Sequence, residues 1–273
     1  MQRLPKGSSP ATSAAGEAPG TEVPGIAMTA VTAADQLQTG TGAPTTGTGL
    51  RPAPGEEVDV LAVAIAAAPE TSPREDSEES LHPTPQPRRG AVETALWYGV
   101  DVAARAATAG VTGKAGETLL VEPPSDRAAD LPAKLIFVGV GDESVQSLRR
   151  AGAALACAAR GANRVRAAVV DGLGAAAQQA FLEGFLLGGY QAPRQGKTPA
   201  GPSMARAMEV TGLDAEALRL ALVTARAVWL ARDLTNLPPD TATPDWMAAQ
   251  SRAVAERAGL EITVLEEAEL LQQ

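Results

Sequence analysis

Side chains that could bind a metal ion are few in this sequence. His82 is the single histidine among 273 residues, and no His-Glu-x-x-His, Cys-x-x-Cys or calcium-loop pattern occurs. A run of carboxylates lies in the polar stretch just before it: Glu75, Asp76, Glu78 and Glu79. Metal ligands must be held close to a fixed geometry, which a polar, proline-rich stretch does not provide. We therefore interpret this acidic run as solvated surface and predict no metal-binding residue.

Candidate nucleophiles are equally few. Cys157 is the only cysteine and lies in the apolar run Ala154–Ala158, so we predict a small buried side chain on a helix. No histidine is placed to act as its base or as the base of a serine, and no Gly-x-Ser-x-Gly motif occurs. We predict no catalytic residue. One cysteine also excludes a disulfide within the chain, which favours a reducing, cytoplasmic location.

Two glycine pairs follow predicted strands and have the residue type that a phosphate loop needs. Gly139-Val140-Gly141 fails the dinucleotide fingerprint because Ser144 stands where Gly or Ala is required. Gly172–Ala177 fits Gly-x-Gly-x-x-Ala between a strand and a helix, but no second strand with a terminal carboxylate follows about 20 residues later. We interpret Gly172 and Gly174 as a tight strand-to-helix turn and predict no cofactor-binding residue. Nucleotide binding by these two loops stays open as an alternative.

The composition points away from nucleic acid and membranes. The formal net charge is -9, whereas a nucleic-acid binder carries a basic patch. No apolar run reaches the ~18 residues of a membrane-spanning helix. No apolar stretch follows the first residues, which argues against a secretory signal. Aromatic residues make up only 3% of the chain, so Leu, Val, Ile and Phe must carry the core.

The elements that would position any site begin after a long tail. Residues 1–55 are rich in Gly, Pro, Thr, Ser and Ala, and we predict that they are disordered, because such a segment buries too little apolar surface to offset its ordering entropy. The apolar run Val58–Ile65 predicts the first strand. A proline-rich loop over 69–90, a helix over 92–107 and a strand over 117–121 follow.

A clear alternation of strand and helix comes next. The elements, in order, are 134–140, 143–160, 165–170 and 173–187. Their lengths predict βαβ units in a mainly parallel or mixed sheet flanked by helices. On the last helix, Phe181 and Phe185 lie one turn apart on one face. We expect Gly184 and Gly188 to let this helix pack closely on the sheet.

The C-terminal third predicts helices with clear ends. After a polar loop over 191–203, a long helix runs from about 214 to 235. Thr243-Pro244 opens the next helix, with Thr as the N-cap and Pro at the first helical position, and Gly259 ends it. Residues 260–265 alternate like a strand. The sequence stops soon afterwards, at a fresh strand-to-helix transition, and we interpret this as a truncated domain.

Several of these segments together resemble the leucyl aminopeptidases of peptidase family M17. Ala231–Asp240 and Thr243–Ala248 resemble the passage from the family's interdomain helix into its catalytic domain: Ala-Arg-Asp-Leu, an Asn, a variable residue, Pro, and then a Thr-Pro that starts a helix. Upstream, Leu135–Asp142 resembles the family's strand ending in Val-Gly-x-Gly, and Phe181–Tyr190 resembles its Glu-Gly-x-x-Leu-x-x-Tyr helix end. The resemblance covers about residues 58–271.

The resemblance implies an α/β fold: a macrodomain-like mixed sheet flanked by helices, then a linking helix and a truncated second α/β domain. In the family, the catalytic domain holds two divalent metals, zinc or manganese, through a Lys, several Asp and a Glu, and a metal-bridging water attacks the peptide carbonyl. Those ligands correspond to no residue of this chain, so we assign no catalytic, metal or cofactor residue. The expected roles of Arg232–Asp240 are structural. Pro238 and Pro239 fix the chain direction, and Asn236 can bond to nearby backbone at the helix end.

We therefore predict four regions along the chain: a disordered tail (1–55), a macrodomain-like N-terminal domain (56–200), a linking helix region (201–235) and the start of a catalytic domain (236–273). The resemblance implies the N-terminal portion of a cytoplasmic leucyl aminopeptidase that acts on peptides and is hexameric at full length. We predict that this chain itself is inactive and binds neither nucleic acid nor membrane. A nucleotide-binding module and a non-catalytic assembly domain remain the alternatives.

Overall fold

The computed structural model describes residues 27–31, 50–53, 55–68, 84–192, 202–265 and 267–271. His82, the acidic run before it and most of the predicted tail lie outside these described residues. The chain divides into two compact units. One unit runs from Val23 to Asn236, and the other contains residues 237–273.

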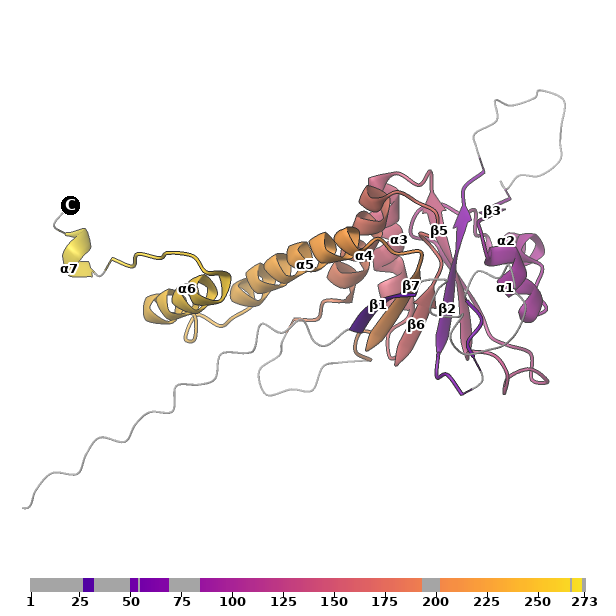
Figure 1. Ribbon diagram of the computed structural model, residues 1–273, viewed down its shortest axis with the longest axis horizontal. Helices are drawn as coiled ribbons and strands as arrows, with labels where there is room; N and C mark the ends of the chain where they lie inside the picture. The colour runs from indigo at the N-terminus through magenta and orange to yellow at the C-terminus, as the bar shows by residue number, and fades with distance from the viewer. Residues whose placement is uncertain are drawn as a thin grey trace, which may run out of the picture. The chain divides into compact units, whose positions relative to one another are not determined.

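The larger unit is built around one mixed sheet (Figure 1). Seven strands form it within the described residues: β1 (Ala27–Val31), β2 (Val60–Ala66), β3 (Gln86–Pro87), β4 (Thr118–Val121), β5 (Lys134–Gly141), β6 (Arg164–Ala167) and β7 (Ala207–Thr211). The order across the sheet is β1-β7-β6-β2-β5-β4. These strands are parallel except β4, which pairs antiparallel with β5; the short β3 pairs antiparallel with β2. The predicted helix-flanked mixed sheet is confirmed.

The central strands are buried on both faces, which explains their nearly continuous apolar sequences. Every residue of β2 is buried. Its side chains alternate between two cores, so Val60, Ala62 and Ala64 enter one core and Leu61, Val63 and Ile65 enter the other.

Helices cover both faces of the sheet (Figure 1). On one face lie α1 (Ala91–Trp97) and α2 (Val102–Ala109). On the other lie α3 (Val145–Ala158) and α4 (Ala175–Gly189), and α5 (Ala215–Thr235) packs against α4. The predicted single helix over 92–107 is therefore wrong, because the chain turns at Gly99, whose φ is 66°.

Helix α4 packs against α3 at very close range. A Cβ on Gly184 would lie 2.0 Å from the backbone oxygen of Arg149, and a Cβ on Gly188 would lie 2.7 Å from the Cα of Ala153. The prediction that these glycines contact the sheet is therefore wrong, since they contact α3 instead. The neighbouring Phe181 and Phe185 are fully buried in the core.

Three strands lie where the sequence predicts none, and one of them is the two-residue β3, within the predicted proline-rich loop over 69–90. β1 falls within the predicted disordered tail and pairs in parallel with β7. β7 falls within the predicted linking region, so the sheet continues past residue 200. Leu50, also assigned to the tail, is fully buried in the core beside α1 and α2. Short segments such as these carry little local signal, and pairing with the rest of the sheet is what orders them.

The unit that contains residues 237–273 includes α6 (Pro244–Ala258) and α7 (Glu267–Leu270). The Thr243 side chain caps α6 by accepting a hydrogen bond from the backbone N of Trp246 at 3.3 Å, and Gly259 (φ 65°) ends the helix, both as predicted. Residues 260–265 do not form the predicted strand. A strand needs a neighbour for its backbone groups, and the described residues supply none here.

Cys157 is a further correction. It lies on α3, as predicted, but its side chain is exposed instead of buried. The helix buries a stripe formed by Leu148, Ala151 and Leu155, and Cys157 lies off that stripe. Among the described residues, no helix has both the length and the apolar character needed to cross a bilayer.

Candidate functional site

The carboxyl ends of the parallel strands are where a sheet of this kind would bind a ligand. Gly139 and Gly141 lie at this edge, at the end of β5, and the chain itself fills the space beside them. A Cβ on Gly139 would lie 2.1 Å from the backbone oxygen of Lys114. Gly141 N also donates to the backbone oxygen of Gly113 at 2.9 Å. These glycines therefore permit close contact between backbone segments, and that contact leaves no space at Gly139 for a phosphate.

The helix that follows β5 already has a carboxylate at its N-terminus. Asp142 accepts hydrogen bonds from the Ser147 hydroxyl at 2.6 Å and from the backbone N of Ser144 at 3.1 Å. The bonds from Ser147 and Ser144 lower the pKa of Asp142 to about 2. The group is therefore ionised at neutral pH and would repel a phosphate from this end of α3.

Gly172 and Gly174 form the predicted tight turn between β6 and α4. Gly172 has a φ of 79°, and Gly174 is the N-cap residue of α4. The side chain of Gln178 connects this turn to the loop after β7 by hydrogen bonds. Its amide nitrogen donates to the carbonyl oxygens of Leu173 and Gly212, both at 3.0 Å. The local geometry is explained by the fold, with no ligand required.

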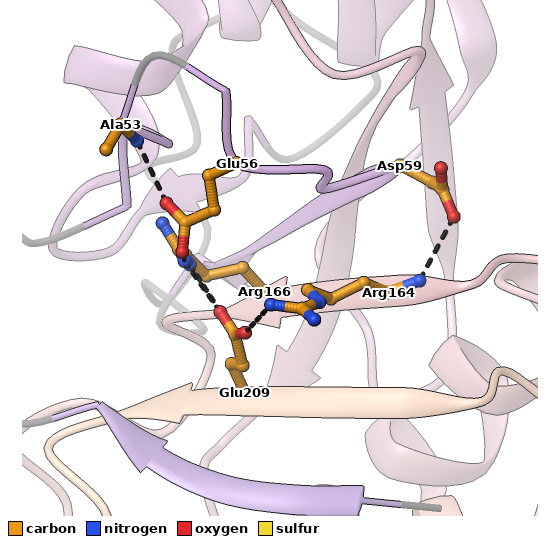
Figure 2. Close-up of polar contacts among 6 residues, drawn as sticks. All are labelled: Ala53, Glu56, Asp59, Arg164, Arg166 and Glu209. Atoms are coloured by element: carbon orange, nitrogen blue, oxygen red, sulfur yellow. Dashed lines mark hydrogen bonds and ion pairs between the residues drawn. The ribbon is translucent and has the colours of Figure 1, made fainter.

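A buried ion-pair network on the sheet is the feature that the sequence analysis missed (Figure 2). Arg166 on β6 is its centre, with a side chain that is only 4% exposed. Its Nη2 lies 2.7 Å from a carboxylate oxygen of Glu209 on β7, and it also donates to Glu56. Glu209 also accepts a hydrogen bond from Arg164 Nη1 at 2.9 Å. The network thus joins β6, β7 and the segment that precedes β2.

The ionisation of this network is set by its own pairs. Burial lowers the pKa of Arg166, but the hydrogen bonds that Arg166 donates to Glu56 and Glu209 outweigh this effect and raise the pKa overall. Burial likewise raises the pKa of Glu56, but its bonds with Arg166 and the backbone N of Ala53 bring the pKa below the ordinary value. Arg166 and Glu56 are therefore both charged at neutral pH. These side chains are hydrogen-bonded to one another, so this network stabilises the fold and offers no free acid or base.

The junction of α4 and α5 contains the motif residues for which structural roles are predicted. Arg232 Nη1 donates to the carbonyl oxygen of Leu187 at 2.9 Å, where a cation complements the C-terminal end of α4. The Tyr190 hydroxyl donates to Asp233 at 2.7 Å, and burial together with this bond raises the pKa of Tyr190. Asn236 Nδ2 donates to the carbonyl oxygen of Arg232 at 2.7 Å, so the predicted backbone contact is confirmed.

The same junction is closed by aromatic packing. The rings of Tyr190 and Trp229 have centroids 5.8 Å apart, and the Arg232 guanidinium lies 5.2 Å from the Tyr190 ring centroid. Together these contacts hold the C-terminal half of α5 against the end of α4. The junction is therefore suited to fixing the direction of a helix.

Metal-ligating side chains do not converge in the described part of the chain. No group of three or more His, Cys, Asp or Glu side chains there could hold a metal ion. The described residues thus do not fit the two-metal site implied by the resemblance. His82 and the acidic run at 75–79 lie outside the described residues.

Comparison with known proteins finds a family model that matches the central part of the chain. Residues 100–195 match the cytosol aminopeptidase family, N-terminal domain. Probable cytosol aminopeptidases of Mycobacterium sp. (strain KMS) and Roseiflexus castenholzii are 32% and 34% identical to the chain, over 176 and 180 residues. These alignments cover 59% of this chain but 32% and 36% of the relatives. The chain therefore spans about a third of the length of these curated relatives.

Solved structures show the same fold. The bottromycin maturation enzyme BotP in complex with Mn is 26% identical, with a TM-score of 0.57, and the match covers 79% of this chain and 40% of that chain. A mutant of tomato leucine aminopeptidase is 19% identical, with a TM-score of 0.65, and the match covers 92% of this chain and 46% of that chain. Both matches extend over most of this chain but less than half of each enzyme.

Proposed function

Because this chain carries the N-terminal region of a peptidase family M17 (cytosol aminopeptidase) protein, we propose that it is the N-terminal portion of a leucyl-aminopeptidase-type metallopeptidase and is itself inactive. The observation that carries the proposal is the family match over residues 100–195, which spans α2 to α4. The parent reaction is the release of N-terminal amino acids from peptides. The parent enzyme is cytoplasmic and hexameric in this proposal.

The proposed inactivity is supported by what the charged side chains of this unit do. Arg166, Glu209 and Glu56 bind one another, and Glu183 pairs with Arg149 between α4 and α3 at 2.7 Å. When bound in the parent enzyme, two zinc or manganese ions supply Lewis acidity and an activated water. No residue described in this chain is assigned to hold them.

In this proposal the chain positions the linking helix and carries out no catalytic step. The Tyr190, Arg232 and Asp233 contacts fix where α5 leaves the sheet domain. In a full-length enzyme this helix leads toward the catalytic domain. The sheet domain therefore acts as a scaffold whose geometry sets the origin of the linking helix.

The direct test of inactivity is hydrolysis of leucine p-nitroanilide by the purified 273-residue chain with added manganese. We expect no rate above the buffer blank, with full-length tomato leucine aminopeptidase as the positive control. Turnover that co-elutes with the chain on gel filtration and is lost on chelation would refute the proposed inactivity.

The parent-enzyme part has its own test, which is the coding sequence downstream of residue 273. We expect a continuing or formerly continuing frame that encodes the Lys, Asp and Glu ligands of a two-metal site. A downstream sequence without such ligands would remove the parent-enzyme proposal and leave the fold assignment intact.

A further inference from the structure

A pocket lies at the amino edge of the sheet, opposite the edge at which a ligand of this fold would be sought. Its volume is about 210 Å³. It is lined by residues at the starts of β2, β5 and β6 and by the turn after α3, including Asp59, Lys134, Arg160 and Asn163. Pockets for drug-sized ligands have volumes of about 300–1,000 Å³, so this one suits a smaller molecule.

Two cations that line this pocket have no side-chain partner within the part of the chain that the structure describes. Neither the Lys134 ammonium nor the Arg160 guanidinium makes an ion pair or a side-chain hydrogen bond among the described residues. In addition, Arg160 Nε is buried and has no acceptor in the described part of the chain. A buried N–H without an acceptor is unfavourable, and few such groups occur in folded proteins. The Arg160 guanidinium therefore retains hydrogen-bond donors that no described residue uses.

The one carboxylate among the lining residues already accepts hydrogen bonds from the backbone. Asp59 accepts hydrogen bonds from the backbone N of Arg164 at 3.0 Å and from the backbone N of Asn163. These bonds hold Asp59 against the backbone at the start of β6, and it makes no ion pair with Lys134 or Arg160. The pocket thus has two cations and one carboxylate that is bound to backbone N–H groups.

From this arrangement we propose that the pocket binds a small oxyanion, with inorganic phosphate as its representative. The planar guanidinium of Arg160 can donate two parallel hydrogen bonds to such an anion, and Lys134 adds a second positive charge. The volume of the pocket suits an ion of this size better than a nucleotide or a peptide. This site is independent of the aminopeptidase proposal, because it uses none of the α4–α5 junction.

The test is titration of the purified full chain with sodium phosphate by isothermal calorimetry, against sodium chloride at matched ionic strength. A parallel titration with sodium acetate separates a tetrahedral oxyanion from a simple carboxylate. We expect saturable binding of phosphate, weaker binding of acetate, and none of chloride. A response to phosphate that equals the response to chloride at matched ionic strength would overturn the proposal, since only screening would remain. Acetate binding as tight as phosphate binding would overturn the choice of phosphate.

The variants Arg160→Gln and Lys134→Gln each remove one charge and keep a polar side chain. Each should weaken phosphate binding by about tenfold or more, because hydrogen bonds to charged groups are the strong ones. Arg105→Gln is the matched control, since Arg105 is an exposed cation on α2 outside the lining. Thermal melts establish whether each variant folds. If Arg160→Gln does not fold, the phosphate affinity of Lys134→Gln is the test of the site. Unchanged affinity in the pocket variants, or an equal loss in the control, would refute the site.

Discussion

Replacing Glu209 by Gln is the sharpest test of how the sheet is held together. The substitution keeps the size of the side chain and removes its charge, which leaves Arg166 buried with Glu56 as its one anionic contact among the described residues. Removing one partner of a buried pair typically costs about 3–5 kcal/mol. We expect the lower end, about 3 kcal/mol, because Glu56 still holds the guanidinium.

The magnitude follows from burial. The side chains of Arg166 and Glu209 are 4% and 11% exposed, so solvent screens their attraction only slightly. For a unit of this size, a change of about 3 kcal/mol lowers the melting temperature by roughly 6–12 °C. Urea unfolding followed by circular dichroism measures the same loss, and an unchanged m-value shows that the cooperative unit is intact.

The matched control is Glu216→Gln on α5. Glu216 pairs with Arg219 on the surface, where both side chains are 60% exposed, so we expect no measurable change in stability. A second arm replaces the core of the network with apolar groups, Arg166→Met together with Glu209→Leu, which should recover much of the loss. The reasoning fails if Glu209→Gln and Glu216→Gln have the same effect, or if the double variant is less stable than the single one.

The remaining predictions concern the junction, acid stability, helix packing and nucleotides. Tyr190→Phe removes the donor to Asp233 and should cost about 1 kcal/mol in urea unfolding; an unchanged midpoint would show that the bond is not needed. The ionised form of Glu56 contributes stability above its ordinary pKa of 4.5, and that stability is lost as the pH falls through the lower folded pKa. Glu56→Gln should therefore flatten the decline of the unfolding free energy below pH 4.5, whereas a parallel decline in both proteins would contradict the assignment. Gly184→Ala places a methyl group against the backbone of Arg149 and should destabilise the fold by about 1–3 kcal/mol or more, and a wild-type melting temperature would show that the two helices can separate. Calorimetry with ADP-ribose and NAD should show no heat of binding, because another backbone segment occupies the space beside the end of β5. Saturable heat with either ligand would restore the nucleotide-binding alternative.

Local patterns in the sequence were sufficient for the elements whose signals are strong. The apolar run at 58–65 predicted β2, and Thr243 and Gly259 predicted both ends of α6. The Asn236 contact with the helix end also follows from local chemistry, because its partner is only four residues away. Weak or short elements failed the same reasoning: β1 and β7 have five residues each, and pairing within the sheet orders them.

The candidate sites show the same division between features that local sequence determines and features that depend on distant contacts. The sequence by itself determined the family resemblance and the turn at Gly172, because motif order and backbone preference are readable along the chain. Only the tertiary structure decided that Arg166 would meet Glu56, 110 residues away, and that Arg160 and Lys134 would line one pocket. A charged side chain on a strand looks the same in sequence whether it faces water or a buried partner. The difference lies in the desolvation and pairing energies that arise only when distant strands are brought together.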